Sequence, residues 1–250
     1  MTGTAASRAY PRPPITEAVI GIQFAAPIAS DDLRKVGERF KNFYPGEQEV
    51  KTLGVHVVNP PAGRPPFANV QETLGHRRAS EDATEIILFM PDQLIVSQLA
   101  PYPGWEEFFA RFVRDWKIWK REMSFLRINR LGVRYVNRID VPVTSDIIEQ
   151  AEYLNIYVQL PEVLGPTMSY TAQAVLTMKD IDAQLVINTG IVPSPLLGHI
   201  SFLVDVDIGR VQNVPQRDEE LIEFLSTLRD KKNAVFEACI TARARELFSR

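Results

Sequence analysis

The sequence predicts an α+β protein in which helices cover one face of an antiparallel sheet. Short stretches of alternating apolar and polar residues, separated by proline and glycine turns, are typical of antiparallel strands. Two long amphipathic patterns, at 105–119 and 217–248, indicate helices. The order strand, helix, several strands and longer helix occurs twice, so we expect two halves, 15–122 and 123–250, packed as one globular unit.

The first half follows a short arm. Residues 1–14 are small, polar and rich in proline without periodicity, which predicts a disordered arm. Residues 15–24 alternate as a strand, and Ser30 is the expected N-cap of a helix that ends before Pro45. The buried stripe of this helix is Leu33, Val36, Phe40 and Phe43.

Four strands and a long helix complete the first half. Residues 50–58 and 67–74 flank a proline-rich loop at 59–66, and 85–90 and 93–99 are expected to form a tight hairpin. One face of the helix carries Trp105, Phe108, Phe109, Phe112, Trp116 and Trp119, and the opposite face carries Glu106, Glu107, Arg111, Arg114 and Lys117. We expect the aromatic face to pack against the sheet, with an aromatic ligand site as the alternative.

The second half is predicted to repeat this order. A long strand at 125–141 precedes a helix capped by Thr144 or Ser145 that continues to Leu154. The strands that follow are 168–179, 183–188 and 199–208. A single long helix then runs from Arg217 to about Phe248, and its buried stripe is Leu221, Leu225, Leu228, Val235, Phe236 and Ile240. The halves share no residue-level identity, so one large antiparallel sheet without duplication remains the rival to two copies of one unit.

Four segments carry a resemblance to a known family. They are 14–20 (PITEAVI), 102–105 (YPGW), 131–139 (LGVRYVNRI) and 202–207 (FLVDVD). As a set they resemble a sporadically distributed bacterial and archaeal family without an assigned activity, over nearly the whole chain. The resemblance implies an accessory role in mobile-element or defence-linked neighbourhoods and supplies no catalytic residues. The element order also resembles a tandem repeat of the TATA-binding-protein-like superfold, a likeness of topology that transfers no function.

Composition and charge exclude several classes of protein. The net charge is −3, so the chain lacks the positive field that supplies most non-specific affinity for nucleic acid. Its single cysteine, Cys239, rules out an intramolecular disulfide and a multi-cysteine zinc site and, with no signal peptide, predicts a cytoplasmic location. No apolar run approaches the roughly 20 residues that span a bilayer, so we expect no membrane association.

The best candidate site is a row of arginines on one predicted strand. Apolar and polar residues alternate along 131–141, so Arg130, Arg134 and Arg138 share one face. Asp205 and Asp207 share a face of a later strand in the same way. These five residues are the predicted ligand-binding set. The arginines can hold phosphates or carboxylates, or pair with the aspartates across strands, which is the explanation we favour. A magnesium or acid–base role for the aspartates lacks a third ligand or a nucleophile.

No recognisable catalytic, metal-binding or cofactor motif accompanies this row. His56, His76 and His199 stand in separate segments without ligand spacing. Cys239 has no histidine nearby and is interpreted as a small buried hydrophobe. The chain has no G-x-S-x-G, no phosphate loop and no G-x-G-x-x-G. We therefore expect no metal, no cofactor and no catalytic residue of a common class, although an enzyme with dispersed residues stays open.

This missing chemistry favours a non-catalytic interaction protein: an accessory subunit, sensor or neutraliser whose partner is another protein encoded nearby. The loop at 59–66 suits protein contact, and a homodimer is a further option. One alternative is nucleic-acid or nucleotide binding by an open arginine face. Another is an enzyme or small-ligand pocket between the aromatic helix and the sheet, which a closed concavity with perturbed titratable groups would reveal.

Overall fold

The computed structural model describes the backbone of residues 10–57, 67–143, 148–165 and 167–249, and their side chains except those of 52–73 and 162. Within this part, nine strands form one antiparallel sheet in the order β2-β3-β4-β5-β1-β6-β9-β8-β7. The strands are β1 (Ile15–Phe24), β2 (Gly46–Val57), β3 (Phe67–Ala79), β4 (Glu85–Met90), β5 (Gln93–Leu99), β6 (Ile128–Pro142), β7 (Thr171–Met178), β8 (Ala183–Val192) and β9 (His199–Arg210). The helices are α1 (Ser30–Arg39), α2 (Trp105–Glu122), α3 (Asp218–Cys239) and α4 (Ala242–Phe248), with 3₁₀ turns at Gln150–Glu152 and Glu162–Leu164.

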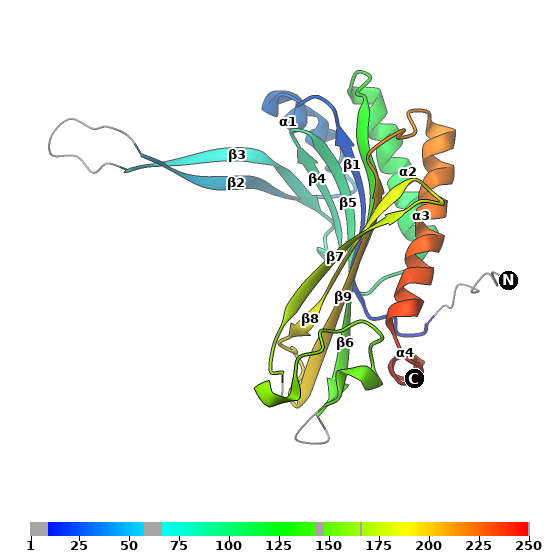
Figure 1. The fold of residues 1–250 in the computed structure, drawn as a ribbon. Coiled ribbons are helices and arrows are strands. Elements are labelled where there is room, and N and C mark those ends of the chain that lie inside the picture. The colour runs from blue at the N-terminus through cyan, green and yellow to red at the C-terminus, as the bar shows by residue number, and fades with distance from the viewer. Residues whose placement is uncertain (1–9, 58–66, 144–147, 166, 250) are drawn as a thin grey trace.

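The predicted α+β class and antiparallel sheet are confirmed. Alternate residues of each central strand turn toward the helices, because successive side chains of a strand point to opposite faces. On β1 these buried residues are Ala18, Ile20, Ile22 and Phe24. α2 and α3 run side by side over this face, and α1 covers β3 and β4 (Figure 1).

The two predicted halves meet in one continuous sheet, because β1 pairs with β6. Ile20 lies opposite Val133, and Val133 lies opposite Ile208 of β9, so apolar residues of both halves stand in one row under the helices. Outward from this junction, the first half runs β1, β5, β4, β3, β2 and the second runs β6, β9, β8, β7. Both halves therefore contribute to one hydrophobic core.

β2 and β3 leave the body as a two-stranded ribbon (Figure 1). β3 is longer than its predicted span because its last four residues, from His76 to Ala79, pair with β4 at the root of the ribbon. The proline-rich loop predicted at 59–66 lies outside the described residues.

The aromatic face of α2 packs on the sheet as predicted. Phe108, Phe112 and Trp119 are buried, and the Trp119 ring lies parallel to Phe24 of β1 and Phe89 of β4 at centroid separations of 5.4 and 6.0 Å. Such burial stabilises the fold by roughly 1.5–3 kcal/mol for each large apolar side chain. An aromatic ligand cage on this face is therefore not needed to explain the pattern.

Residues 10–14 of the predicted arm make defined contacts with the C-terminal helices. Tyr10 lies edge-on to Phe248 at 5.4 Å and donates a hydrogen bond of 2.5 Å to Glu237. The Arg12 N–H donates to the carbonyl of Phe248 at 3.2 Å. Residues 1–9 lie outside the described part of the chain.

Two predicted helices differ from the structure for one shared reason. The predicted helix was to continue to Leu154. Within 148–154 the structure has only the 3₁₀ turn Gln150–Glu152, and 144–147 lie outside the described part. The predicted terminal helix divides into α3 and α4 at Ile240, whose backbone is extended. Leu154 and Ile240 form a β-bridge, and Asn155 donates to the carbonyl of Cys239 at 2.8 Å. The Thr241 N–H likewise donates to the carbonyl of Tyr153 at 3.0 Å, so the backbone groups on either side of the bridge pair with each other and not within a continuing helix. The tertiary contact overrides the local helical pattern at this point.

Helix caps were also predicted incompletely. α1 begins at Ser30, but its N-cap is Ala29, with no side-chain cap, so Ser30 is the first helical residue. Thr241, which the sequence analysis did not select, caps α4 by accepting a hydrogen bond from the Ala244 N–H at 3.3 Å.

A buried polar cluster joins the end of α1 to α2. Tyr44 donates a short hydrogen bond to Asp115, which is fully buried, and accepts from Arg111 at 3.0 Å and from Arg114 at 3.1 Å. Burial raises the pKa of the Asp115 carboxyl, and burial together with that carboxylate raises the pKa of Tyr44. Arg111, which the sequence places on the face opposite the aromatic residues, is buried, and its guanidinium also donates to the carbonyl of Ser97 of β5 at 2.9 Å.

We predict that Tyr44→Phe lowers the free energy of unfolding by about 1–3 kcal/mol, because Asp115 and two guanidinium groups lose a shared buried partner. The matched change Tyr157→Phe removes a partly exposed hydroxyl and should alter it by less than about 0.5 kcal/mol. Urea denaturation at pH 7 measures both. Equal losses for the two variants would contradict the role of the cluster.

Candidate functional site

The three predicted arginines share one face of β6, as the alternation indicated. Leu131, Val133 and Tyr135 are buried on the helix side, so Arg130, Arg134 and Arg138 point to the far face of the sheet, away from α2 and α3. We call this row of arginines and its acidic partners the arginine face. The arginine face lies near the middle of the sheet, because β6 is placed between β1 and β9.

The predicted cross-strand ion pair forms between Arg134 and Asp205. The Arg134 guanidinium donates two hydrogen bonds, of 2.9 and 2.8 Å, to the two carboxylate oxygens of Asp205. This bidentate contact raises the pKa of Arg134 above its ordinary value. Asp205 is buried and also accepts from Asn188 of β8 at 2.9 Å, so its carboxylate is well satisfied.

The other two arginines also have carboxylate partners. Arg130 donates to Asp207 at 2.6 Å. Arg138 pairs with Asp140 of its own strand at 3.1 Å instead of Asp205 or Asp207, which Arg134 and Arg130 already hold. Asp140 lies an even number of residues from each arginine along β6 and so shares their face of the strand. The sequence therefore already indicated that it could pair with one of them.

Glycines let Arg130 reach its partner. Gly132 and Gly209 lie opposite each other on β6 and β9. A Cβ atom added at Gly132 would lie 2.8 Å from Arg130 Nη1, and one at Gly209 would lie 2.7 Å from Arg130 Nη2. The guanidinium therefore lies across two glycines on its way to Asp207, and any larger residue at either position would displace it.

The arginine face is thus an ion-paired surface. All five predicted ligand-binding residues lie together on it, and each arginine donates to a carboxylate 2.6 to 3.1 Å away. A nucleic-acid site of the kind considered from the sequence requires cations that aspartates do not neutralise. The geometry favours the structural explanation of this row.

A cavity of about 340 Å³ lies on the other side of β6, beneath α3. It is lined by residues 10–15, by residues 102–106 at the start of α2, by β6 and by α3. We call it the Lys232 cavity, and its lining residues are Tyr10, Pro11, Pro13, Pro14, Ile15, Tyr102, Pro103, Gly104, Trp105, Glu106, Tyr135, Asn137, Arg229, Lys232, Asn233, Phe236 and Glu237. Its size is that of a small-molecule site.

Lys232 is the unusual residue of this cavity. Its side chain is only 7% exposed, and its Nζ lies 3.7 Å from the centroid of the Tyr135 ring. Among the described residues, no side chain or carbonyl forms a hydrogen bond or ion pair with it. Burial, with a smaller effect of nearby Arg229, lowers the pKa of Lys232 to about 7.

Two tyrosines of the same cavity are perturbed as well. The hydroxyls of Tyr102 and Tyr135 lie 3.0 Å apart. Burial raises the pKa of Tyr102 to about 12 and that of Tyr135 well above its ordinary value. The sequence analysis expected a ligand pocket, with titratable groups of perturbed pKa, between the aromatic helix and the sheet. The Lys232 cavity has such groups, but of α2 only Trp105 and Glu106 line it.

Sequence reasoning missed Lys232 although a signal was present. Lys232 stands four residues after Leu228 and four before Phe236, so it interrupts the predicted apolar stripe of the last helix. A lysine at such a position either reaches solvent or is buried, and the helical pattern cannot tell which.

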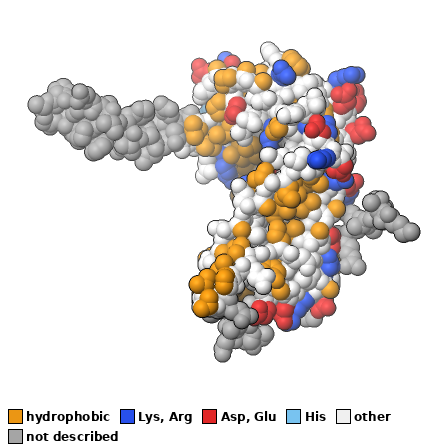
Figure 2. All heavy atoms as spheres, in the orientation of Figure 1, with side chains coloured by type: hydrophobic (Ala, Val, Ile, Leu, Met, Phe, Trp, Pro, Cys, Tyr) orange, Lys and Arg blue, Asp and Glu red, His pale blue; other side chains and the backbone are white. Residues whose placement is uncertain are grey.

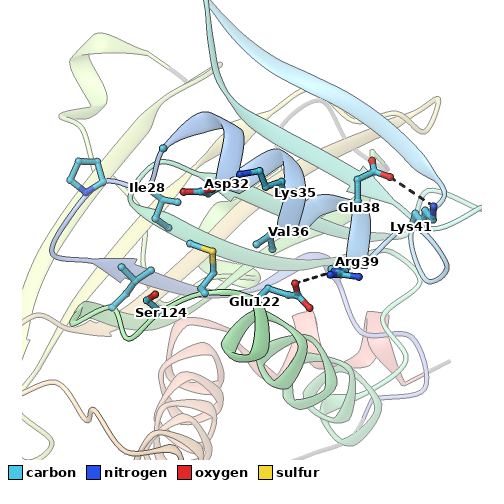
Figure 3. A pocket seen from close by; sticks show the side chains of 13 residues that line it. Ile28, Asp32, Lys35, Val36, Glu38, Arg39, Lys41, Glu122 and Ser124 are labelled. Carbon is cyan, nitrogen blue, oxygen red and sulfur yellow. Dashed lines mark hydrogen bonds and ion pairs between the residues drawn. The ribbon is translucent and has the colours of Figure 1, made fainter.

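A wider hollow of about 820 Å³ lies between α1 and the end of α2 (Figure 3). Its charged side chains pair with one another: Arg39 with Glu122 at 3.0 Å and Lys41 with Glu38 at 4.0 Å, as the dashed lines show. Asp32 and Lys35 pair at 3.1 Å. No unbalanced charge marks this hollow as a binding site.

An apolar surface lies at the β7 edge of the sheet. Val175 and Leu176 of β7 are 56% and 46% exposed, although they point to opposite faces of the strand. Leu164 and Met168, which precede β7 in the chain, and Leu197, in the connection between β8 and β9, are also exposed. We call these five residues the apolar edge, and Figure 2 shows hydrophobic side chains gathered at the lower left, where Figure 1 draws this strand.

The remaining candidates offer little chemistry. Burial raises the pKa of the Cys239 thiol to about 11, which agrees with an unreactive core cysteine. His76 is buried, and His199 contacts the carbonyl of Leu197. The described part of the chain contains no cluster of three metal-ligating side chains. None of its helices has the length and apolar character to span a membrane.

Comparison of the chain with models of known protein families and with curated proteins finds no match. The resemblance to a bacterial and archaeal family without assigned activity therefore stays a prediction.

We predict that Arg134→Met lowers the free energy of unfolding by about 1–3 kcal/mol, because it leaves the buried Asp205 carboxylate without its bidentate partner. Arg138→Met is the matched control. Asp140 keeps hydrogen bonds from Ser201 and Ser194, so the expected loss is below about 1 kcal/mol. Denaturant titration of both variants at low salt tests the difference, and similar losses would show that the Asp205 pair is not special.

Proposed function

We propose that this chain is a non-catalytic interaction protein of the cytoplasm that binds a strand of another protein along β7. The observation that carries the proposal is the unprotected edge of the sheet at this strand. We further infer that the partner is encoded nearby and that the chain serves it as an accessory subunit, sensor or neutraliser in a mobile-element or defence-linked system. The family resemblance supports that setting.

The two edges of the sheet differ in how they resist unwanted pairing. Natural edge strands are protected by charges, prolines, bulges or a covering segment. β2, at one edge, carries Glu47, Glu49 and Lys51 and has a register shift between Val50 and Lys51. β7, at the other edge, reads TAQAVLTM, with neither a charged residue nor a proline. An edge without these devices suits a strand that is covered in its working state.

The apolar edge extends this surface beyond the backbone. Val175 lies on the far face of the sheet and Leu176 on the helix side, so an added strand would cover apolar surface on both faces. Leu197, which is 98% exposed, lies in the connection that follows β8, and the start of β7 pairs near the end of β8, with Thr171 opposite Gly190. A partner strand that continues past Thr171 would cover it too.

A second copy of the chain fits this surface less well than a different protein. In a two-fold antiparallel pairing of two β7 strands, the start of each strand faces the end of the other. The apolar start of β7 would then meet the turn at 179–182, which contains Lys179, Asp180 and Asp182. Leu164 and Leu197 would stay uncovered, whereas an unrelated partner is free to supply apolar residues there.

The arrangement of the sheet also supports an internal duplication. In each half the first strand is central in the sheet, and the last strand of the half pairs beside it: β5 beside β1, and β9 beside β6. Each half then ends with a long helix on the same face of the sheet. We infer that the two halves are copies of one unit whose first strands, β1 and β6, became paired. A duplication of this kind leaves one free edge to each half and explains why only the second half needs a partner at β7, since the first half ends in the β2–β3 ribbon.

We predict that a photo-crosslinking residue placed at Val175 in the native cell captures one protein. After purification, that protein should protect the β7 amides of this chain from hydrogen exchange, because an added strand bonds their free side. The double variant Val175→Lys and Leu176→Lys should weaken the reconstituted complex at least about tenfold, since two apolar contacts worth roughly 1 kcal/mol each are replaced by charge.

Phe125→Lys is the matched control, because Phe125 is exposed in the connection between α2 and β6, away from the apolar edge. This variant should bind the partner as the wild-type chain does. The proposal would be overturned if the purified chain formed a homodimer with protected β7 amides, or if the captured protein protected a different surface.

A further inference from the structure

The Lys232 cavity combines a buried cation with the start of a helix. Lys232 reaches it from α3, and Gly104, Trp105 and Glu106 bring the first turn of α2 to its wall. No side chain caps α2, so the N–H groups of its first turn are available at the positive end of an 18-residue helix. Two independent features thus favour negative charge in one cavity.

The charges already present leave Lys232 unmatched. Arg229 contacts Asp230 at 3.0 Å and Glu106 at 3.6 Å. Glu237 accepts hydrogen bonds from Tyr10 at 2.5 Å and from Arg245 at 2.8 Å. Each carboxylate of the lining is therefore engaged by another residue, and the Lys232 ammonium lies over the face of the Tyr135 ring at 3.7 Å from its centroid.

A buried ammonium without an anion is costly, because burial penalises the charged form. Cation–π contact with Tyr135 offsets only part of this cost. A ligand that supplied an anionic group would offset the remainder.

Much of the remaining wall consists of aromatic and proline rings. Trp105 and Phe236 are buried, and Tyr102, Pro103 and the prolines of residues 11–14 complete the surface. Side chains of this kind hold flat apolar groups, while a few polar groups fix orientation. The volume of about 340 Å³ limits the ligand to roughly the size of one substituted ring.

We propose that the Lys232 cavity binds a small organic anion, a carboxylate or a phosphate monoester with a ring-sized apolar body, whose anionic group lies against Lys232 and the start of α2. This inference is independent of the β7 interface, and either proposal can fail alone.

Binding of such an anion is coupled to protonation. The titratable and charged groups that face Lys232 are Tyr10 of the N-terminal segment, Tyr102 of the loop before α2, Glu106 of α2, Tyr135 of β6, and Arg229 and Glu237 of α3. Between pH 6 and 8 we expect Lys232 to dominate the change of charge, since its pKa is about 7 and those of Tyr102 and Tyr135 are far higher. An anion stabilises the protonated amine, so binding raises the lysine pKa and takes up a proton above pH 7.

We predict that phenylacetate binds the full chain with one site and a Kd on the order of 0.1–1 mM, as the efficiency of small ligands allows. Isothermal titration at pH 8 in two buffers of different ionisation enthalpy should reveal uptake of about one proton, falling toward zero at pH 6. The Kd should rise up to about tenfold from pH 6 to pH 8, because the protonated fraction of Lys232 falls.

Phenylacetamide, which lacks the charge, should bind at least about tenfold more weakly. Phenyl phosphate in place of phenylacetate distinguishes the two classes of headgroup by relative affinity.

Lys232→Met should weaken phenylacetate binding at least about tenfold and abolish proton uptake, while its apolar side chain keeps the helix packed. Lys231→Met is the matched control, because Lys231 is the next residue of α3 but pairs with Asp180 outside the cavity. It should leave the Kd unchanged within about twofold.

The proposal would be overturned if neither anion bound, or if phenylacetamide bound as tightly as phenylacetate. Binding without proton uptake at pH 8 would overturn it as well, and this test needs only the wild-type chain if Lys232→Met fails to fold. Full binding by a folded Lys232→Met variant would have the same meaning.

Discussion

The pairing of β1 with β6 is the constraint on which the rest of this structure depends. It joins the strands of two halves into one sheet and places apolar residues of both, such as Ile20 and Val133, in one row beneath α2 and α3. Without that pairing, each half would leave the edge of its first strand open and its share of the core incomplete. The central position of β6 then decides what both of its faces do.

The two faces of β6 treat charge in opposite ways. On the far face, Arg134 and Asp205 neutralise each other across the strands, so a pattern that looks like an anion site in sequence is part of the fold. On the helix side, Tyr135 stands under Lys232, whose positive charge has no carboxylate partner in the described part of the chain. Function is better sought where a buried charge is unmatched than where arginines are numerous, because a buried unpaired charge has an energetic cost that fold stability alone does not explain.

The proposed partner surface and the proposed ligand cavity lie in different places in this molecule. The apolar edge at β7 is an extended surface whose free backbone groups and exposed side chains suit a macromolecule. The Lys232 cavity is small, about 340 Å³, and is proposed to hold a single compact ligand. The two lie on different elements, with β8 and β9 between β7 and β6. A protein that binds both a partner and a small anion would be able to report on the second through the first, since α3 and the sheet connect them.

The sequence by itself determined the α+β class, most strand positions, the aromatic face of α2 and the shared face of the three arginines, because these follow from local periodicity of two or 3.6 residues. Which carboxylate each arginine meets depends on the cross-strand register: Arg134 takes Asp205 of β9, and Arg138 pairs with Asp140 of its own strand. The bridge between Leu154 and Ile240 likewise lies where the predicted terminal helix divides into α3 and α4. The burial of Lys232 also depends on residues 10–15 and 102–106 closing over α3, and no local pattern contains contacts between segments so far apart in the chain.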